Sequence, residues 1–120
     1  MTDPNSIAQA YLSVWNEPDD GARQKHIAQG WSDDARYIDP MMASEGHEEI
    51  ARMIEDIRAR FPGHRFTLSS RPDGHGRYAR FSWTLAPEDG PAVAKGTDVA
   101  RVDSDGRIAE VIGFLDTGPA

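Results

Sequence analysis

The stretch ARYIDP, residues 35–40, decides how the rest of the chain is interpreted. Tyr37 and Ile38 favour a pleated, half-buried strand, and Pro40 ends that strand because proline lacks the N–H that a ladder needs. Proline also favours an extended conformation in the residue before it, so Asp39 is expected at the end of the strand. This aspartate is either a turn residue, since Asp-Pro commonly begins a turn, or a functional carboxylate.

The residues around Asp39 support the functional interpretation. Tyr37 precedes it, and Met41 and Met42 follow it, so the carboxylate lies in mostly apolar company. A carboxylate in such surroundings has a raised pKa or a specific partner, and either is typical of a general base. Methionine fills irregular apolar gaps and often lines adaptable pockets. Asp39 is therefore a candidate base, and the two methionines are candidate pocket residues.

The composition is that of a small acidic protein. The 120 residues fit one domain, 1–120, with one core. Hydrophobic residues make up only 38%, but three Trp, four Phe and three Tyr can fill a small core. The net charge of −7 and the pI of about 4.9 argue against a nucleic acid or an anionic membrane surface as partner.

Signals for a compartment or a cofactor are few. The absence of cysteine excludes disulfides and thiolate chemistry and favours a reducing compartment, so a cytoplasmic location is expected. No signal peptide and no membrane span is expected, because the N-terminus lacks a basic and an apolar run and no apolar stretch is long enough. His47-Glu48-Glu49 has no second histidine at i+4, and no glycine-rich loop joins a strand to a helix. Neither a metal nor a cofactor is therefore expected.

The first of three predicted helices carries a tyrosine on its apolar face. Asp3 can cap a helix that has Pro4 at its first position. An apolar stripe then repeats every four residues through Tyr11 and Trp15, and the helix ends near residue 16. Tyr11 is either a core side chain whose hydroxyl reaches the surface, which is the commoner case, or a hydrogen-bond donor in a pocket.

Two further helices flank the strand that ends at Asp39. The second is expected over about Ala22–Gln29, begun by Asp20 or Gly21 and stopped by a glycine. The third is expected over about His47–Arg60. Its buried face is marked at helical spacing by Ile50, Met53, Ile54, Ile57 and Phe61.

From residue 64 the hydrophobic period changes to two, which is typical of strands. Four strands separated by turn clusters are expected: His64–Arg71, Arg77–Ala86, Ala92–Val102 and Arg107–Asp116. Phe81 and Trp83 share one face of the second, and Asp98 lies on an otherwise uncharged face of the third. Gly96 and Gly113 suit bends or bulges. Helices first and strands after predict an α+β fold, with three helices packed on a curved, mostly antiparallel sheet.

The order of elements resembles the cone-shaped fold of the nuclear-transport-factor-2-like (cystatin-like) superfamily, which includes ketosteroid isomerases, polyketide cyclases and the SnoaL-like group. The resemblance covers about residues 8–116. It rests on three segments: Gln9–Leu12 with Asn16 and Asp19, Ser32–Pro40, and Thr97–Val102 followed by Gly106–Ile108. In the isomerases, the matching segments carry a tyrosine that donates to the substrate oxyanion, a proton-shuttling aspartate and a second, protonated aspartate.

The resemblance implies a site that removes a proton next to a carbonyl. Asp39 would be the base, and Tyr11 and a protonated Asp98 would donate to the oxygen that becomes negative. From the residues alone, Asp98 could instead be the partner of Arg80, Arg101 or a backbone amide. The residues expected to contact the substrate are Trp15, Trp31, Met41, Met42, Met53, Ile57, Phe81, Trp83 and Phe114.

The expected partner is a small hydrophobic molecule with a keto or enone group. Two other functions stay open. One is a non-catalytic ligand-binding or dimerisation module of the same fold. The other is epoxide hydrolysis, which needs two carboxylates and an arginine together, whereas strand alternation puts Arg80 and Arg101 on the face opposite Asp98. The resemblance also implies a homodimer through the outer sheet face that carries Ser82 and Thr84, although no strong apolar patch is evident there.

Overall fold

The computed structural model describes residues 3–117. Its elements follow in the order α1 (Pro4–Asn16), α2 (Asp20–Gly30), β1 (Trp31–Ile38), β2 (Ala43–Glu45), α3 (Gly46–Arg60), β3 (His64–Leu68), β4 (Asp73–His75), β5 (Tyr78–Pro87), β6 (Ala94–Val102) and β7 (Ile108–Thr117). None of these helices is long and apolar enough to cross a membrane.

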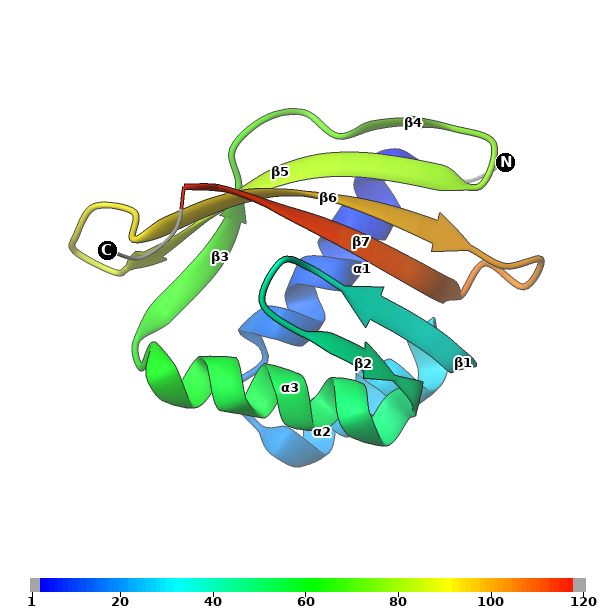
Figure 1. Ribbon diagram of the computed structural model, residues 1–120, viewed down its shortest axis with the longest axis horizontal. Helices are drawn as coiled ribbons and strands as arrows, with labels where there is room; N and C mark the ends of the chain where they lie inside the picture. Colours follow the sequence, from blue (N-terminus) through cyan, green and yellow to red (C-terminus); the bar gives the residue numbers. More distant parts are fainter. Residues whose placement is uncertain (1–2, 118–120) are drawn as a thin grey trace.

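The three helices pack against one face of a curved sheet (Figure 1). The strand order is β2-β1-β7-β6-β5-β3, and β4 pairs with β5 outside this path. All pairings are antiparallel except that of β1 with β7, which is parallel. The predicted α+β fold, with three helices on a mostly antiparallel curved sheet, is confirmed.

Local sequence sets the helix boundaries. The Asp3 side chain caps α1, as predicted. Asp19, rather than Asp20 or Gly21, caps α2, because its carboxylate accepts a hydrogen bond from the Ala22 backbone N–H at 2.7 Å. The second helix therefore starts earlier than the sequence predicts, whereas the third agrees with the prediction to within a residue.

Two short strands are not evident in the sequence. β2 pairs with the end of β1, and β4 pairs with the start of β5 inside a segment predicted as a turn. Each has three residues, which is too short for an alternating pattern to be visible. β3 also ends at Leu68, before the predicted end at Arg71.

The core lies between the inner face of the sheet and the helices. Tyr11 of α1 packs on Trp31 and Phe81, with ring centroids 5.9 and 5.2 Å apart. Trp15, one turn later, packs against Phe66 at 5.3 Å. Tyr11, Trp15 and Phe66 line the cavity described next, whereas the rings of Trp31 and Phe81 support Tyr11 from behind.

Candidate functional site

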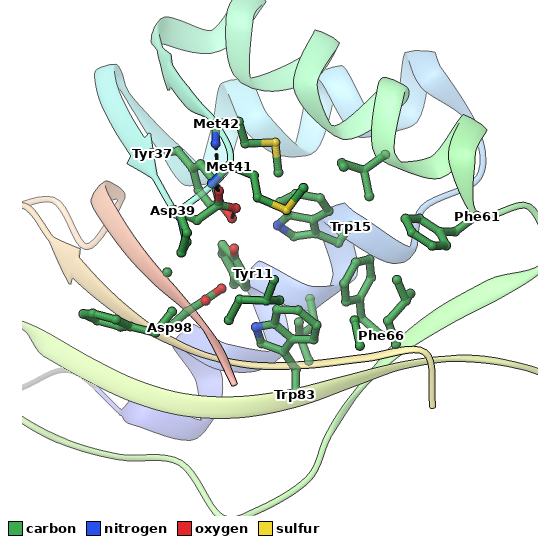
Figure 2. A pocket seen from close by; sticks show the side chains of 18 of the residues that line it. Tyr11, Trp15, Tyr37, Asp39, Met41, Met42, Phe61, Phe66, Trp83 and Asp98 are labelled. Carbon is green, nitrogen blue, oxygen red and sulfur yellow. Dashed lines mark hydrogen bonds between the residues drawn. The ribbon is translucent and has the colours of Figure 1, made fainter. Parts of the chain in front are cut away.

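A cavity of about 310 Å³ lies between the inner face of the sheet and the helices α1 and α3 (Figure 2). Most of its lining is apolar. Its carboxylates and hydroxyls gather at one end, where Figure 2 shows Asp39, Tyr11 and Asp98, while Phe61 and Phe66 lie toward the other end. The three predicted catalytic residues therefore line one cavity although they come from α1, the β1–β2 turn and β6.

Asp39 uses both carboxylate oxygens in hydrogen bonds. Oδ1 accepts from the backbone N–H groups of Met41 and Met42 at 2.8 and 2.9 Å. Oδ2 accepts from the Tyr37 hydroxyl at 2.7 Å. The backbone N–H of Asp39 also donates to the Met42 carbonyl at 2.9 Å and closes the turn between β1 and β2. Asp39 is thus a turn residue that also lines the cavity.

Tyr37 is a site residue that the sequence analysis names only as a neighbour of Asp39. It is 5% exposed and lines the cavity. Burial, the charge of Asp98 and the hydrogen bond to Asp39 raise the pKa of Tyr37, so it stays a neutral donor. The signal was present in the sequence, because residues two apart on a strand share one face.

Asp98 is a buried carboxylate that has no cation beside it among residues 3–117. It is 2% exposed. Burial, with smaller contributions from the charges of Asp39 and Asp116, raises the pKa of Asp98 to about 6, and the Tyr11 hydroxyl and Trp83 indole oppose this rise. The alternative arginine partners lie elsewhere: their ion pairs are Arg80 with Asp73 and Arg101 with Glu110.

Tyr11 combines burial with a hydroxyl at the polar end of the cavity. It is 2% exposed and is held by the stacked ring of Trp31 and the tilted ring of Phe81. Burial first, and then the charge of Asp98, raises the pKa of Tyr11 well above its usual range. The hydroxyl therefore keeps its proton and can donate to an oxygen atom in the cavity.

Two glycines make room for the polar end. A Cβ on Gly113 would lie 2.9 Å from Asp98 Oδ1 and 3.1 Å from Asp39 Cβ, so this glycine separates the two carboxylates. A Cβ on Gly96 would overlap the Trp83 indole. Gly96 lies at a register shift, as the sequence predicts, but Gly113 pairs in register with Asp98. There is therefore no bulge at Gly113, and close approach explains the glycine.

Trp15 adds a buried donor to the cavity. Its indole Nε1 has no hydrogen-bond partner among residues 3–117, although Trp15 is only 4% exposed. A buried donor without a partner costs free energy, which a ligand oxygen could recover. The sequence predicts Trp15 as a substrate contact on an apolar stripe, but the pattern does not indicate this buried donor.

The expected substrate contacts divide into two groups. Those that line the cavity are Trp15, Met41, Met42, Ile57, Trp83 and Phe114. Trp31 and Phe81 do not line it, because they pack behind Tyr11, and Met53 lines an adjoining cavity instead. Because the apolar face of a helix or strand extends beyond the cavity, hydrophobic periodicity alone does not distinguish the residues that line the cavity from those that only fill the core. The lining residues that were not predicted are Leu12, Tyr37, Pro40, Arg60, Phe61, Phe66, Leu85, Ala94, Gly113 and Leu115.

The sequence matches the SnoaL-like domain family over residues 8–111. Among curated proteins, none matches the chain. A crystal structure from Agrobacterium tumefaciens, of a protein provisionally assigned as an isomerase of the SnoaL-like family, is 51% identical with a TM-score of 0.92. The similarity covers 97% of this chain and 99% of that one.

More distant structures share the fold. A SnoaL-like protein of unknown function from Burkholderia thailandensis is 13% identical, with a TM-score of 0.74 over 96% of this chain and 98% of that one. A protein from Sinorhizobium meliloti, provisionally assigned as a polyketide cyclase, is 18% identical, with a TM-score of 0.71 over 90% and 93%. At these identities the likeness concerns the fold alone. The family match spans most of the sequence and confirms the resemblance found there: the chain belongs to the SnoaL-like domain family.

Proposed function

We propose that the cavity catalyses the isomerisation or cyclisation of a small keto or enone compound, beginning with removal of a proton next to its carbonyl. The observation that carries the proposal is the placement of Asp39, Tyr11 and Asp98 at one end of an apolar cavity. The provisional assignment of the 51% identical Agrobacterium protein as an isomerase supports it. The side chains provide a base and hydrogen-bond donors, so the reaction needs no cofactor.

Asp39 would take the proton. A carboxylate offers about four acceptor positions, and hydrogen bonds from Tyr37, Met41 and Met42 occupy three of them. One position on Oδ2 remains for the proton of the substrate carbon. As the C–H bond breaks, its electron pair forms the double bond of an enolate, and the carbonyl π pair moves to oxygen. The three hydrogen bonds hold the carboxylate in one orientation throughout.

Tyr11 and Asp98 would stabilise the oxygen that becomes negative. Both are 2% exposed, so their hydrogen bonds act where water is excluded. With a pKa of about 6, Asp98 exists partly as the neutral acid near neutral pH, and a negative oxygen beside it favours that form further. One such donor typically contributes about 10²–10³ to the rate.

The second half of the reaction separates an isomerase from a cyclase. In an isomerase, Asp39 returns the proton to a different carbon, and the double bond shifts. In a cyclase, the enolate carbon attacks a second carbonyl of the same molecule, and the new alkoxide takes the proton from Asp39. A cavity of about 310 Å³ is at the small end of ligand sites, which favours a substrate with one or two rings.

The first test separates binding from chemistry. 2-Naphthol, a planar phenol, mimics an enolate, and calorimetry measures its affinity. Tyr11→Phe and Asp98→Ala should each weaken binding by about tenfold. Asp39→Asn should bind at least as tightly as the native protein, because it removes a negative charge near the bound oxygen.

The second test follows proton removal itself. In D₂O the native protein should catalyse deuterium incorporation next to the carbonyl of 2-tetralone, measured by NMR. Asp39→Asn should lose about 10²–10⁴ of this rate. The control is Asp34→Asn, which changes an exposed aspartate on β1 that accepts a hydrogen bond from the Ser32 hydroxyl and does not line the cavity. Exchange that survives Asp39→Asn would exclude Asp39 as the base.

A non-catalytic ligand-binding module is the second candidate. It is favoured by the fact that the Asp39 hydrogen bonds also close a turn, a role that needs no chemistry. It predicts binding of 2-naphthol without deuterium exchange in any ketone tested. Epoxide hydrolysis has less support, because the ion pairs of Arg80 and Arg101 direct both side chains to other carboxylates. Arg60 does line the cavity, but it adjoins Phe61 at the end away from Asp39 and Asp98.

A further inference from the structure

Arg60, the last residue of α3, is an exposed cation in the wall of a mostly apolar cavity. It lines both the main cavity and an adjoining one formed mainly by α3 and the β1–β2 turn. In the described part of the chain it is the one Lys or Arg residue of the main cavity lining. It precedes Phe61, which Figure 2 shows at the end of the cavity away from Asp39 and Asp98.

The Arg60 guanidinium has no counterion among the residues that the structure describes. It forms neither an ion pair nor a hydrogen bond with any residue of 3–117. Asp56, one helical turn earlier, lines only the adjoining cavity. Arg36, Arg58, Arg65, Arg71 and Arg77 likewise have no ion pair among residues 3–117, so what sets Arg60 apart is its place in the cavity lining. Other arginines do have acidic partners within 4.0 Å: Arg23, Arg52, Arg80, Arg101 and Arg107.

We propose that the substrate is a keto or enone acid whose carboxylate binds Arg60 while its carbonyl oxygen lies at Tyr11 and Asp98. This rests on the proposed function for the position of the carbonyl. Arginine suits the role because its planar fork binds a carboxylate through two parallel hydrogen bonds. The apolar wall between the two ends, with Trp15 and Phe66, accommodates the hydrocarbon part of the molecule.

The charges of the cavity also determine the orientation in which the substrate binds. Asp39 and Asp98 gather at one end and would repel an anion there, whereas Arg60 adjoins Phe61, which lies at the other end. A carboxylate remote from the carbonyl is therefore held in one orientation only. A carboxylate adjacent to the carbonyl would be forced toward the two aspartates, so the site discriminates by the distance between the two groups as well as by charge.

A set of matched naphthols tests the proposal by calorimetry. In 6-hydroxy-2-naphthoate the carboxylate is remote from the enolate-like hydroxyl, its methyl ester has the same shape without the charge, and 3-hydroxy-2-naphthoate has the carboxylate adjacent. The native protein should bind the remote acid about tenfold more tightly than the ester, with a preference that falls as salt rises. It should bind the adjacent acid more weakly than the ester.

Variants assign the preference to one side chain. Arg60→Gln should bind acid and ester equally, and Arg60→Lys should keep part of the preference. The control is Arg65→Gln, which removes the same charge from an exposed arginine of β3 that does not line the cavity. It should retain the full preference.

Each contrary outcome has a definite meaning. An acid that binds the native protein no more tightly than its ester, or a preference that persists in Arg60→Gln, overturns the carboxylate site. If Tyr11→Phe leaves ester binding unchanged while Arg60→Gln removes the acid preference, the proposed function fails and the carboxylate site stands. If none of the naphthols binds, both proposals are overturned.

Discussion

The two oxygens of Asp39 have different partners. Oδ1 accepts two backbone N–H groups of the turn, whereas Oδ2 accepts the Tyr37 hydroxyl at the cavity. A base held in this way loses little rotational freedom when substrate arrives. The same bonds fix the turn that leads β1 into β2, so the backbone and the carboxylate are positioned together.

Asp98 should make stability depend on pH. Burial raises its pKa from 3.8 to about 6, so between about pH 4 and 6 the folded state binds a proton that the unfolded chain releases. Stability therefore falls as pH rises through this window, by a total of about 3 kcal/mol. Asp98→Asn removes the titration, and its free energy of unfolding should exceed that of the native protein by about 2–3 kcal/mol at pH 8.

Urea denaturation of the native protein and Asp98→Asn between pH 4 and pH 8 measures this effect. The difference between the two proteins should grow with pH and level off above about pH 6. Asp34→Asn, at an exposed position of β1, serves as the control and should show no such trend. A variant less stable than the native protein at pH 8 would mean that the contacts of the carboxylate outweigh the cost of burying it.

At the scale of elements, the register between β6 and β7 determines the shape of the polar end. Gly113 pairs with Asp98, and an added Cβ would meet Asp98 Oδ1 at 2.9 Å and Asp39 Cβ at 3.1 Å. Gly113→Ala should therefore displace one carboxylate and weaken 2-naphthol binding by about tenfold or more. The fold should survive, since alanine is otherwise acceptable in a strand.

Gly30→Ala is the matched control, because a Cβ on Gly30 would meet no atom within 4 Å. Calorimetry should give it native affinity for 2-naphthol, and circular dichroism should show both variants folded. Native affinity in Gly113→Ala would show that the carboxylates do not depend on this spacing.

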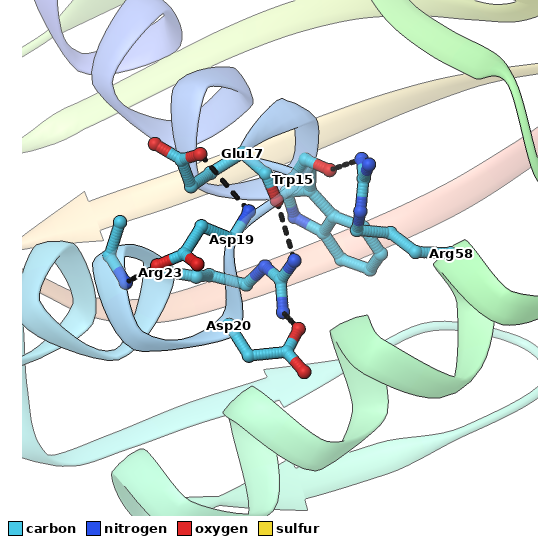
Figure 3. Close-up of polar contacts among 7 residues, drawn as sticks. Trp15, Glu17, Asp19, Asp20, Arg23 and Arg58 are labelled. Atoms are coloured by element: carbon cyan, nitrogen blue, oxygen red, sulfur yellow. Dashed lines mark hydrogen bonds and ion pairs between the residues drawn. The ribbon is translucent and has the colours of Figure 1, made fainter.

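A buried arginine joins the end of α1 to the start of α2 (Figure 3). Arg23 is 1% exposed, and its guanidinium donates to Asp20 at 2.8 Å and to the Glu17 carbonyl. Arg58 of α3 reaches the same region and donates to the Trp15 carbonyl at 2.9 Å. Together the two arginines satisfy carbonyl groups at the end of α1 that the helix itself leaves open.

Arg23→Ala should destabilise the fold by about 3 kcal/mol, because it leaves a cavity and an unpaired carbonyl. Asp20→Asn should lower the free energy of unfolding by less than about 1 kcal/mol. The Asp20 side chain is 66% exposed, so water screens its ion pair with Arg23. Urea midpoints of the two variants give the comparison. Equal losses would assign the stability to the ion pair rather than to the buried guanidinium.

The elements differ in how far local sequence determines them. Capping and hydrophobic period are local, so the three helices and the long strands could be predicted. The parallel pairing of β1 with β7 joins distant segments, and strand alternation does not specify it. That pairing brings Gly113 beside Asp39, and it could not be predicted. The family resemblance predicts that Tyr11, Asp39 and Asp98 share one site. The place of Arg60 in the cavity lining could not be predicted, because its sequence context is that of any exposed arginine at the end of a helix.

At the scale of the whole molecule, the two faces of the sheet differ. The inner face carries the cavity. On the outer face Ile38 and Ile112 are 51% and 39% exposed, and Phe114, which also borders the cavity, is 56% exposed. Ile38 pairs with Ile112, and Phe114 follows two residues later on the same face, so the three form an apolar patch. The patch could not be predicted from the sequence, because Ile38 of β1 meets Ile112 and Phe114 of β7 only through the parallel pairing of the two strands.

This patch argues for the homodimer that the family resemblance implies, since exposed apolar patches commonly mark contacts between subunits. Sedimentation velocity should give the native protein about twice the 13.2 kDa mass of the chain. The double variant Ile38→Lys/Ile112→Lys should sediment as a monomer, because two charges cannot be buried unpaired in each half of the interface. It should still bind 2-naphthol, since neither isoleucine lines the cavity.

Tyr78→Lys is the control for the added charge. Tyr78 lies on β5 outside the patch and is 46% exposed, so this variant should remain a dimer. A native protein that sediments as a monomer at all concentrations, or a double variant that remains a dimer, would place the contact elsewhere or exclude it.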